Sequence, residues 1–337
     1  MRASYDPSYA YARICGSIAN AYIGKKALTL IHNAHVGDAW RVLFGQQPPA
    51  LPEAVLLLAA QSETKVRALN DFRELSAGLE REVPFFAALL RKPEFAYVKS
   101  LAAAIVEGLI SPPARTDPGA SSEVSSERYP DLDRMFGGTR FDWIAREGLG
   151  DLTALKNRVD RQYYEELWLS LDSLPRSRSE RLRALIAREA EIENLVWALR
   201  LRRYYALSKD EIEGLLIRLP GRDVASSALH ALDLRPDLRS DWEGWAWDRF
   251  LRGARTGAEG EWFLDVRGIE GAARRYVFRL IRRNLHLDPF GYTPLYAFYR
   301  IKEIESAAVN GILEGIRMQA PAAEIAAFAL DATGGAA

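Results

Sequence analysis

The sequence has little cysteine and no excess of charge of either sign, and both facts narrow the class of protein. Cys15 is its single cysteine, so no disulfide can form within the chain, as is usual in a reducing compartment. Forty-five basic residues stand against forty-five acidic ones, which leaves no net field to attract nucleic acid. We therefore expect a cytoplasmic protein that has no nucleic-acid partner.

Long apolar runs and phosphate-binding motifs are also missing. The longest uninterrupted aliphatic run is 54–60, far below the roughly 20 residues that span a bilayer. The first seven residues lack the apolar core of a signal peptide. No G-x-x-x-x-G-K-[ST] motif occurs, so nothing in the sequence predicts a phosphate loop for ATP. These absences favour a soluble chain without a nucleotide cofactor.

What the sequence does contain is typical of an all-α protein. Apolar residues make up 48% and charged residues 27%, as in an ordinary globular chain with a core. Apolar positions recur at steps of three and four, while alternating runs bounded by turn residues are absent. A capping box, Ser208 to Glu211, opens a short helix. Further helices are expected at 8–31, from Pro52 onward, and at 62–82, 94–110, 151–171, 178–206, 268–284 and 321–330. One more helix is expected to have Thr293 as its N-cap and Pro294 as its first residue, and to run past Arg317.

Two of these helices form an internal repeat. In each, an apolar stripe carries carboxylates in its middle, and Glu191-Ile-Glu193 superposes on Glu303-Ile-Glu305 at an offset of 112 residues. An offset of 114 fits almost as well. Because the chain is about three times this length, we predict three helical units, at 1–118, 119–225 and 226–337. The first is degenerate and includes a flexible, low-complexity linker at about 111–128.

Several motifs resemble one known family. They are Tyr9-Ala-Tyr-Ala-Arg13, Glu189-x-Glu-x-Glu-Asn-Leu195, Pro289-Phe-Gly291 and Lys302-Glu-x-Glu305. The chain resembles the C subunit of archaeal and bacterial A/V-type ATPases, whose eukaryotic counterpart is the d subunit. That resemblance implies three similar units around a pseudo-threefold axis, shaped like a funnel. It also implies a non-catalytic subunit that needs no cofactor and no small-molecule substrate.

The resemblance further implies a place in a rotary motor. Members of this family sit on the cytoplasmic face of the membrane, on the proteolipid rotor ring, and accept the central shaft. The chain would then be cytoplasmic and peripheral to the membrane. It would couple ATP hydrolysis or synthesis to proton or sodium transport, with the ring and the shaft proteins as its partners.

Polar residues on the repeated apolar stripes are the main candidate site residues. Carboxylates in such places could be catalytic acids with raised pKa values, but buried polar groups are normally satisfied within the fold. We expect them to accept hydrogen bonds from backbone donors of neighbouring helices or to pair with Arg200 and Arg203. The predicted structural, buried polar residues are Glu189, Glu193, Asn194, Glu303 and Glu305.

Other clusters allow more than one interpretation. The helix at 268–284 concentrates arginines that fit a solvated face, lipid headgroups, nucleic acid or polar loops of the rotor ring; they are Arg274, Arg275, Arg279, Arg282 and Arg283. His32, His35 and Asp38 have helical spacing but lack the further ligands of a closed metal site, so no metal is expected. A tryptophan-rich segment, 242–262, is expected to pack a helix–loop corner.

Two rival functions remain at this stage. The first is an all-helical scaffold or adaptor for an unrelated protein partner, although repeats of about 112 residues exceed the 20 to 50 of solenoid units. The second is a helical isoprenoid synthase, which needs two facing aspartate clusters to hold magnesium and diphosphate. Only Asp131 and Asp133 resemble one cluster, and it has no mate.

Overall fold

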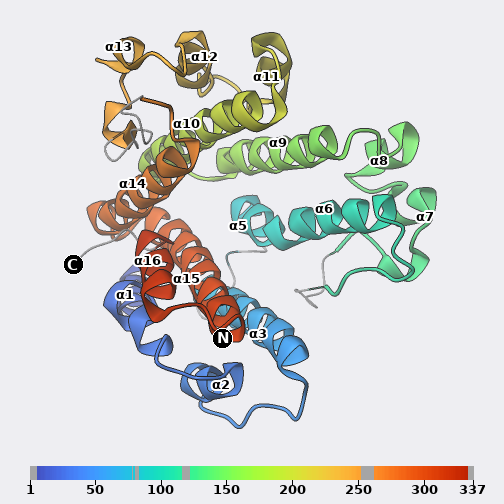
Figure 1. Ribbon diagram of the computed structural model, residues 1–337, viewed down its shortest axis with the longest axis vertical. Helices are drawn as coiled ribbons and strands as arrows, with labels where there is room; N and C mark the ends of the chain where they lie inside the picture. The colour runs from blue at the N-terminus through green and yellow to red at the C-terminus, as the bar shows by residue number, and fades with distance from the viewer. Residues whose placement is uncertain (1–5, 78, 80–82, 116–121, 252–261, 333–337) are drawn as a thin grey trace. The chain divides into compact units, whose positions relative to one another are not determined.

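The described chain is built from helices. The computed structural model describes residues 6–77, 79, 83–115, 122–251 and 262–332 (Figure 1). Within these ranges no segment is a β-strand, and Leu219 and Arg222 form an isolated bridge. The predicted all-α class is therefore confirmed. A funnel around a pseudo-threefold axis stays a prediction.

Contacts between residues divide the chain into two compact units. Unit 1 combines Met1–Gly78, Arg176–Ile192 and Asp233–Ala337, and unit 2 combines Leu79–Pro175 with Glu193–Leu232. The boundary between Ile192 and Glu193 falls inside one long helix, α10 (Arg176–Tyr205). A division into three repeats at 118 and 225 remains a prediction, and the compact units do not follow those two boundaries.

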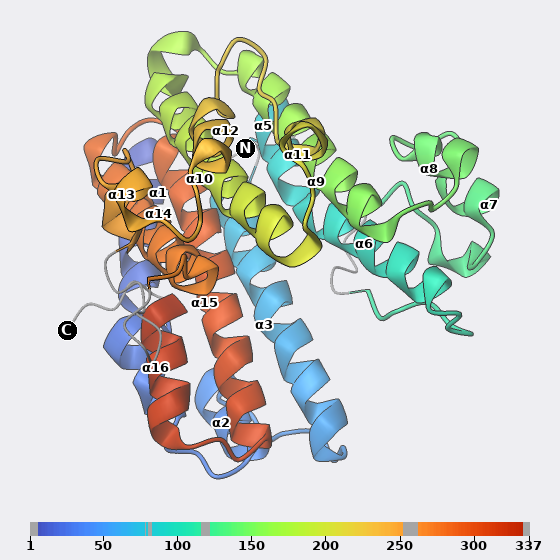
Figure 2. The ribbon, with the colours of Figure 1, turned by 45° about the horizontal axis from the view of Figure 1, so that its top comes forward.

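Unit 1 is organised around α15 (Thr293–Arg317), which packs against α3, α14, α16 and α1. In Figures 1 and 2, α15 lies between α3 on one side and α16 on the other. Its apolar stripe explains this position, because Leu295, Phe298, Ile301 and Ile312 have no exposed surface at all. The elements of unit 1 besides α15 and the first part of α10 are α1 (Pro7–Ala19), η1 (Gly24–Leu30), α2 (Val36–Phe44), α3 (Glu53–Leu75), α13 (Arg239–Trp242), η4 (Asp248–Leu251), α14 (Val266–Leu287) and α16 (Ala322–Ala332).

In unit 2, α6 (Lys92–Val106) and α9 (Leu152–Ser170) lie side by side, as both views show (Figures 1 and 2). Phe95 joins them, because its ring meets Tyr163 of α9 edge to face at a centroid distance of 5.3 Å. The other elements of unit 2 are α5 (Pro84–Leu90), η2 (Ser126–Arg128), α7 (Leu132–Phe136), α8 (Asp142–Glu147), η3 (Leu171–Ser173), the second part of α10, α11 (Lys209–Leu215) and α12 (Ser226–Asp233).

Several predicted helix boundaries were wrong, and three of them have a clear physical reason. The helix expected at 8–31 ends at Ala19, and a 3₁₀ segment follows from Gly24, whose φ of 55° is incompatible with a continuing right-handed helix. The helices expected after Pro52 and at 62–82 are one helix, α3, because no breaking residue separates them. Thr293 is the first residue of α15 rather than its cap, and its hydroxyl donates to Asp288 Oδ2 at 3.1 Å.

The predicted capping box was confirmed. Ser208 and Glu211 form a reciprocal capping box at the start of α11. Asp131, the candidate diphosphate ligand, caps α7 by accepting a hydrogen bond from Arg134 N. That contact gives the aspartate a structural role at the helix start.

The expected linker is anchored at its end. Residues 116–121 lie outside the described ranges, but Glu94 of α6 is buried and accepts from Glu123 N at 2.6 Å and from Ser122 Oγ at 2.7 Å. Val124 is buried as well. The segment after 121 is therefore held against α6 rather than free, contrary to the prediction of a flexible linker up to about 128.

Candidate functional site

Glu305 lies at the centre of a polar network in unit 1. Its Oε1 accepts a hydrogen bond from Tyr22 N at 2.6 Å, and its Oε2 pairs with Lys302 Nζ at 2.9 Å. Lys302 also reaches Asp71 Oδ2 of α3 at 3.5 Å. Burial and the Glu305 charge together raise the pKa of Tyr22 above its ordinary value. The carboxylate thus ties the chain after α1 to α15, and through Lys302 to α3.

Glu189 forms a second network in unit 1. Only 4% of its side chain is exposed, and Oε2 accepts from Arg300 Nε of α15 at 2.9 Å. Arg300 also pairs with Glu303, which is half-buried. Arg300 is thus a charged partner of Glu189, whereas backbone donors of neighbouring helices or Arg200 and Arg203 were expected. Both networks join α15 to another element of unit 1 and hold the unit together.

Asn194 is the fully buried polar residue of unit 2. Its Nδ2 donates to Ile217 O at 2.9 Å and to Val224 O at 2.8 Å, and its Oδ1 accepts from Ile217 N at 2.7 Å. One amide therefore holds both ends of the loop between α11 and α12, which we call the 217–225 loop. Trp168 Nε1 of α9 donates to Pro220 O at 3.0 Å and holds the tip of that loop.

Glu193 and Glu303 are both half-buried, so the prediction that they would be buried was wrong. The repeat was aligned with Glu193 on Glu305, but burial and charged partners make Glu189 the counterpart of Glu305. In that register Asn194 corresponds to Asn310, five residues after each acid. The side-chain oxygen of Asn310 makes no hydrogen bond, so the position is shared but the contact is not.

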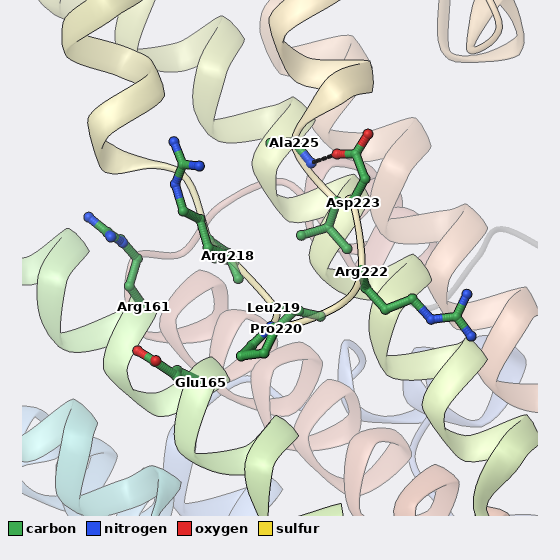
Figure 3. Close-up of a pocket in the computed structure, with 10 residues that line it drawn as sticks. Arg161, Glu165, Arg218, Leu219, Pro220, Arg222, Asp223 and Ala225 are labelled. Carbon is green, nitrogen blue, oxygen red and sulfur yellow. Dashed lines mark hydrogen bonds between the residues drawn. The ribbon is translucent and has the colours of Figure 1, made fainter.

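A pocket of about 450 Å³ lies between α9 and the 217–225 loop (Figure 3). Arg161 and Glu165 approach it from α9, and Arg218 approaches it from the loop. Arg161 donates to Gly214 O at 2.5 Å. Burial lowers the pKa of Arg161, and the like charge of Arg218 lowers it further. In Figure 3 the guanidinium of Arg222 points away from those of Arg161 and Arg218.

The arginines of α14 form a charged face, which we call the α14 arginine face. Arg279 and Arg283 are exposed, and Arg275 is partly buried. Arg274 is exposed and lies 3.8 Å from Glu270, a distance that gives only a weak, solvated pair. Arg282 stacks over Phe278 with its charge still in solvent. The α14 arginine face is therefore accessible to a binding partner.

The described part of the tryptophan-rich segment packs a corner, as predicted, and residues 252–261 lie outside the described ranges. Trp242, Trp245, Trp247 and Phe250 are each less than 5% exposed. Trp242 meets Trp245 edge to face and donates its Nε1–H to Arg235 O at 2.7 Å. These rings serve the packing of unit 1 and expose too little surface to anchor a partner.

His32 and His35 do not belong to a group of side chains that could bind a metal ion in the described part of the chain. His32 and His35 are exposed, and Asp38 pairs with Arg41 at 2.7 Å. In the described part of the chain, no three histidine, cysteine, aspartate or glutamate side chains group as they would around a metal ion.

Sequence reasoning missed two polar centres in unit 2. Glu94 lies on the stripe of Val98 and Leu101, so the rule that found Glu305 would have found it. Arg140 is mostly buried and pairs with Glu123 and Glu166. These two acids are 43 residues apart, and no local pattern marks Arg140 as their common partner.

These features define a class: an all-helical protein whose long helices carry buried acids and amides that bind other parts of the fold. None of the described helices has the length and apolar character of a membrane span. The ATP synthase (C/AC39) subunit family matches residues 59–328, most of the chain. The chain therefore belongs to this family, and the resemblance found in its motifs is confirmed.

Two relatives are consistent with this membership. An uncharacterised protein of Treponema pallidum (strain Nichols) is 26% identical over 318 residues, covering 91% of this chain and 92% of its own length. The C subunit of the A-type ATP synthase of Methanosarcina mazei is 23% identical over 213 residues, covering 63% of this chain and 57% of its own length. The chain is thus similar to a named ATP synthase component over little more than half of that component.

Proposed function

We propose that the chain is a non-catalytic central-stalk subunit of a rotary A/V-type ATPase. In this role it sits on the proteolipid rotor ring at the cytoplasmic face of the membrane and connects the ring to the central shaft. Rotation would then pass between ATP hydrolysis or synthesis and the transport of protons or sodium. The observation that carries the proposal is the family match over residues 59–328.

The chemistry of the buried acids supports a non-catalytic role. A catalytic acid or base must reach a substrate proton, so its carboxylate has to be available in a cleft. Glu305 is engaged by Tyr22 N and Lys302, and Glu189 is engaged by Arg300. These contacts use the carboxylates to connect helices. A rigid connection between helices is what a torque-transmitting protein needs.

The α14 arginine face is our candidate for contact with the polar loops of the ring. Its exposed guanidiniums can each bind carboxylates or backbone carbonyls with several donors. Since Arg279 and Arg283 are exposed on α14, charge reversal there would change a partner contact with little effect on the fold. The complex carrying Arg279→Glu and Arg283→Glu should retain less of this chain after a salt wash than the unaltered complex.

Co-purification tests the proposed function. The chain would be tagged in its native cell, the membranes extracted gently, and the bound proteins identified by mass spectrometry. We expect a small proteolipid together with shaft and catalytic ATPase subunits. Recovery of the chain without any ATPase subunit above background would overturn the proposal and favour a helical scaffold for another partner.

A matched control separates the interface from the fold. Arg235→Glu also reverses an exposed arginine charge, but it lies outside α14 and its partner is Asp241. We expect the control to co-purify like the unaltered chain. Equal loss of ATPase subunits from the control and from the α14 variants would show that charge alone, rather than the α14 arginine face, causes the effect.

A further inference from the structure

The pocket of unit 2 is a preformed cleft. At about 450 Å³ it has the size of clefts that bind small molecules or single side chains. Asn194 fixes the two ends of the 217–225 loop, and Trp168 fixes its tip at Pro220. Gly221, with a φ of 70°, permits the tight reversal between these anchors. Little conformational entropy is therefore lost when a ligand enters.

Positive charge is in excess on one side of the cleft. Figure 3 shows Arg161, Glu165 and Arg218 on this side. No carboxylate of the described chain lies within ion-pair distance of Arg161, whose side chain donates to the carbonyl oxygen of Gly214. Among the residues that line this side, two guanidiniums therefore face one carboxylate. Glu213, which is not among the lining residues, balances the second charge by pairing with Arg218, so the excess becomes available to a ligand that displaces Glu213.

The other carboxylate that lines the cleft is already engaged. Asp223 Oδ1 accepts hydrogen bonds from Ala225 N and Ser226 N, both at 3.0 Å, at the start of α12. These backbone donors hold the pKa of Asp223 below its ordinary value. Its charge is therefore directed toward the end of a helix, and the excess beside Arg161 and Arg218 remains.

The existing partner of Arg218 is easily displaced. Arg218 NH2 lies 3.3 Å from Glu213 Oε1, and the two side chains are 61% and 44% exposed. Ion pairs this exposed add little stability, since water screens them and both side chains lose freedom. A ligand that enters the cleft and binds both Arg161 and Arg218 would give Arg218 a partner that is less exposed to water than Glu213 is.

We propose that this cleft binds a carboxylate of a partner polypeptide, held between Arg161 and Arg218. A single negative charge matches the local excess, whereas a doubly charged phosphate would leave uncompensated negative charge beside Glu165. Guanidiniums bind carboxylates through two parallel hydrogen bonds, which gives direction as well as attraction. Pro220 supplies an apolar wall for the residue next to the carboxylate. The identity of the polypeptide as a neighbouring ATPase subunit rests on the proposed function. The carboxylate-binding chemistry of the cleft is independent of that function.

Peptide titration of the isolated full chain tests the binding chemistry. The probes are acetyl-Leu-Glu-amide, acetyl-Leu-Gln-amide and acetyl-Leu-Gln with a free carboxyl end. The readout is the indole N–H resonance of Trp168, which bonds to the loop tip and is assigned by its loss in Trp168→Phe. We expect saturable shifts in the millimolar range with either carboxylate probe and none with the neutral amide. Tighter binding of acetyl-Leu-Glu-amide would indicate a side-chain carboxylate, and tighter binding of acetyl-Leu-Gln with its free carboxyl end would indicate a chain terminus.

Matched variants locate the carboxylate. Arg161→Gln and Arg218→Gln should each weaken binding on the order of tenfold, as expected for loss of a charge-assisted bidentate contact. Arg222 also lines the pocket, but its guanidinium points away from those of Arg161 and Arg218. Arg222→Gln removes the same charge from the same loop and should therefore bind the carboxylate probes normally. Equal weakening in all three variants, equal shifts with inorganic phosphate, or no saturable shift would each overturn the proposal.

A second experiment uses the assembled complex. Arg218→Glu should release the chain from its complex at lower salt than Arg222→Glu does. Identical salt release of these two variants, in a complex that does contain ATPase subunits, would contradict the cleft and leave the proposed function standing. If the unaltered chain binds no ATPase subunit, the proposed function fails and the peptide titration still decides the cleft.

Discussion

Glu305 of unit 1 and Asn194 of unit 2 are both polar residues inside an apolar stripe, but the fold accommodates them differently. In unit 1, Glu305 as a whole residue is 8% exposed, and its carboxylate pairs with Lys302, whose side chain is 13% exposed. In unit 2 the amide of Asn194 has no exposed surface and makes three hydrogen bonds to backbone. The charged centre keeps a partner in contact with water, whereas the neutral centre is completely enclosed.

This difference follows from the free energy of desolvation. Moving a charge out of water costs several kcal/mol, which only a nearby counter-charge and further hydrogen bonds offset. A neutral amide costs less and can be enclosed once each of its polar atoms has a partner. The charged centres therefore connect helices near the surface of unit 1, and the amide defines the shape of a loop in unit 2.

Removing the enclosed amide should have the largest effect. Asn194→Leu leaves Ile217 N, Ile217 O and Val224 O without their partner, and unsatisfied buried groups cost about 1–3 kcal/mol each. We expect a loss of about 3–5 kcal/mol in the free energy of unfolding, measured in urea by circular dichroism. Asn310→Leu is the control, since Asn310 Oδ1 has no hydrogen bond to lose, and it should cost below about 1 kcal/mol. Similar losses for the two variants would contradict the comparison.

Glu305 should show a smaller effect that depends on the replacement. Glu305→Ala removes the acceptor of Tyr22 N and the partner of Lys302, although Lys302 keeps Asp71 at 3.5 Å. A loss of about 2–4 kcal/mol is expected from urea unfolding. Glu305→Gln retains an oxygen for Tyr22 N and should cost about half as much. Equal losses of unfolding free energy for Glu305→Ala and Glu305→Gln would show that the charge of Glu305 contributes more stability than its hydrogen bond to Tyr22 N.

Arg140 tests a charged centre within unit 2 through pH. The hydrogen bond from Arg140 holds the pKa of Glu123 below its ordinary value of 4.5. A carboxyl whose pKa is depressed on folding contributes stability above that ordinary value, and loses it as the pH falls through the folded pKa. Arg140→Gln should therefore cost about 1 kcal/mol at neutral pH, and this cost should shrink as the pH falls below 4.5.

The expected pH dependence is measured by urea unfolding of both proteins, from neutral pH down to about one pH unit below the ordinary glutamate pKa of 4.5. Arg146→Gln is a suitable control, because Arg146 pairs with Asp142 at an exposed position and has no contact with Glu123. A cost for Arg140→Gln that stays constant or grows on acidification would show that the Glu123 pair contributes no stability.

The smallest effect is expected at an exposed cap. Ser208→Ala removes the hydroxyl that accepts from Glu211 N at the start of α11, and comparable caps contribute about 1 kcal/mol. Ser208→Asp restores an acceptor and should recover most of that stability. The stability of the unaltered chain, Ser208→Ala and Ser208→Asp is measured by thermal unfolding. If Ser208→Ala lost as much stability as Asn194→Leu, the expectation that buried polar groups contribute more than exposed ones would be contradicted.

The fold class was readable from the sequence because helical periodicity and capping are local. Spacing of apolar residues predicted α15, and the Ser208 capping box predicted the start of α11. Burial of Glu189 and Glu305 was also foreseen, since an acid within an apolar stripe has to face the core. Glu193 was misjudged because it is four residues from Glu189, at a place where the stripe is only half covered.

The partners of those residues were not readable, because they come from distant segments. Arg300 reaches Glu189 across 111 residues, and Tyr22 N reaches Glu305 across 283. The cleft of unit 2 depends on Asn194 holding a loop that starts 23 residues later. Only tertiary packing brings such pairs together, and a single sequence gives no sign of which donor will meet which acceptor.

Cross-linking this chain to the proteolipid ring tests the central claim most directly. If both belong to one rotor, they turn together, and a covalent bond between them should leave ATP-driven ion transport in membrane vesicles almost unchanged. A bond from this chain to a catalytic ATPase subunit should stop transport, since it would join moving and stationary parts. Loss of transport on linking the chain to the ring, with full recovery when the bond is cleaved, would contradict a central-stalk role.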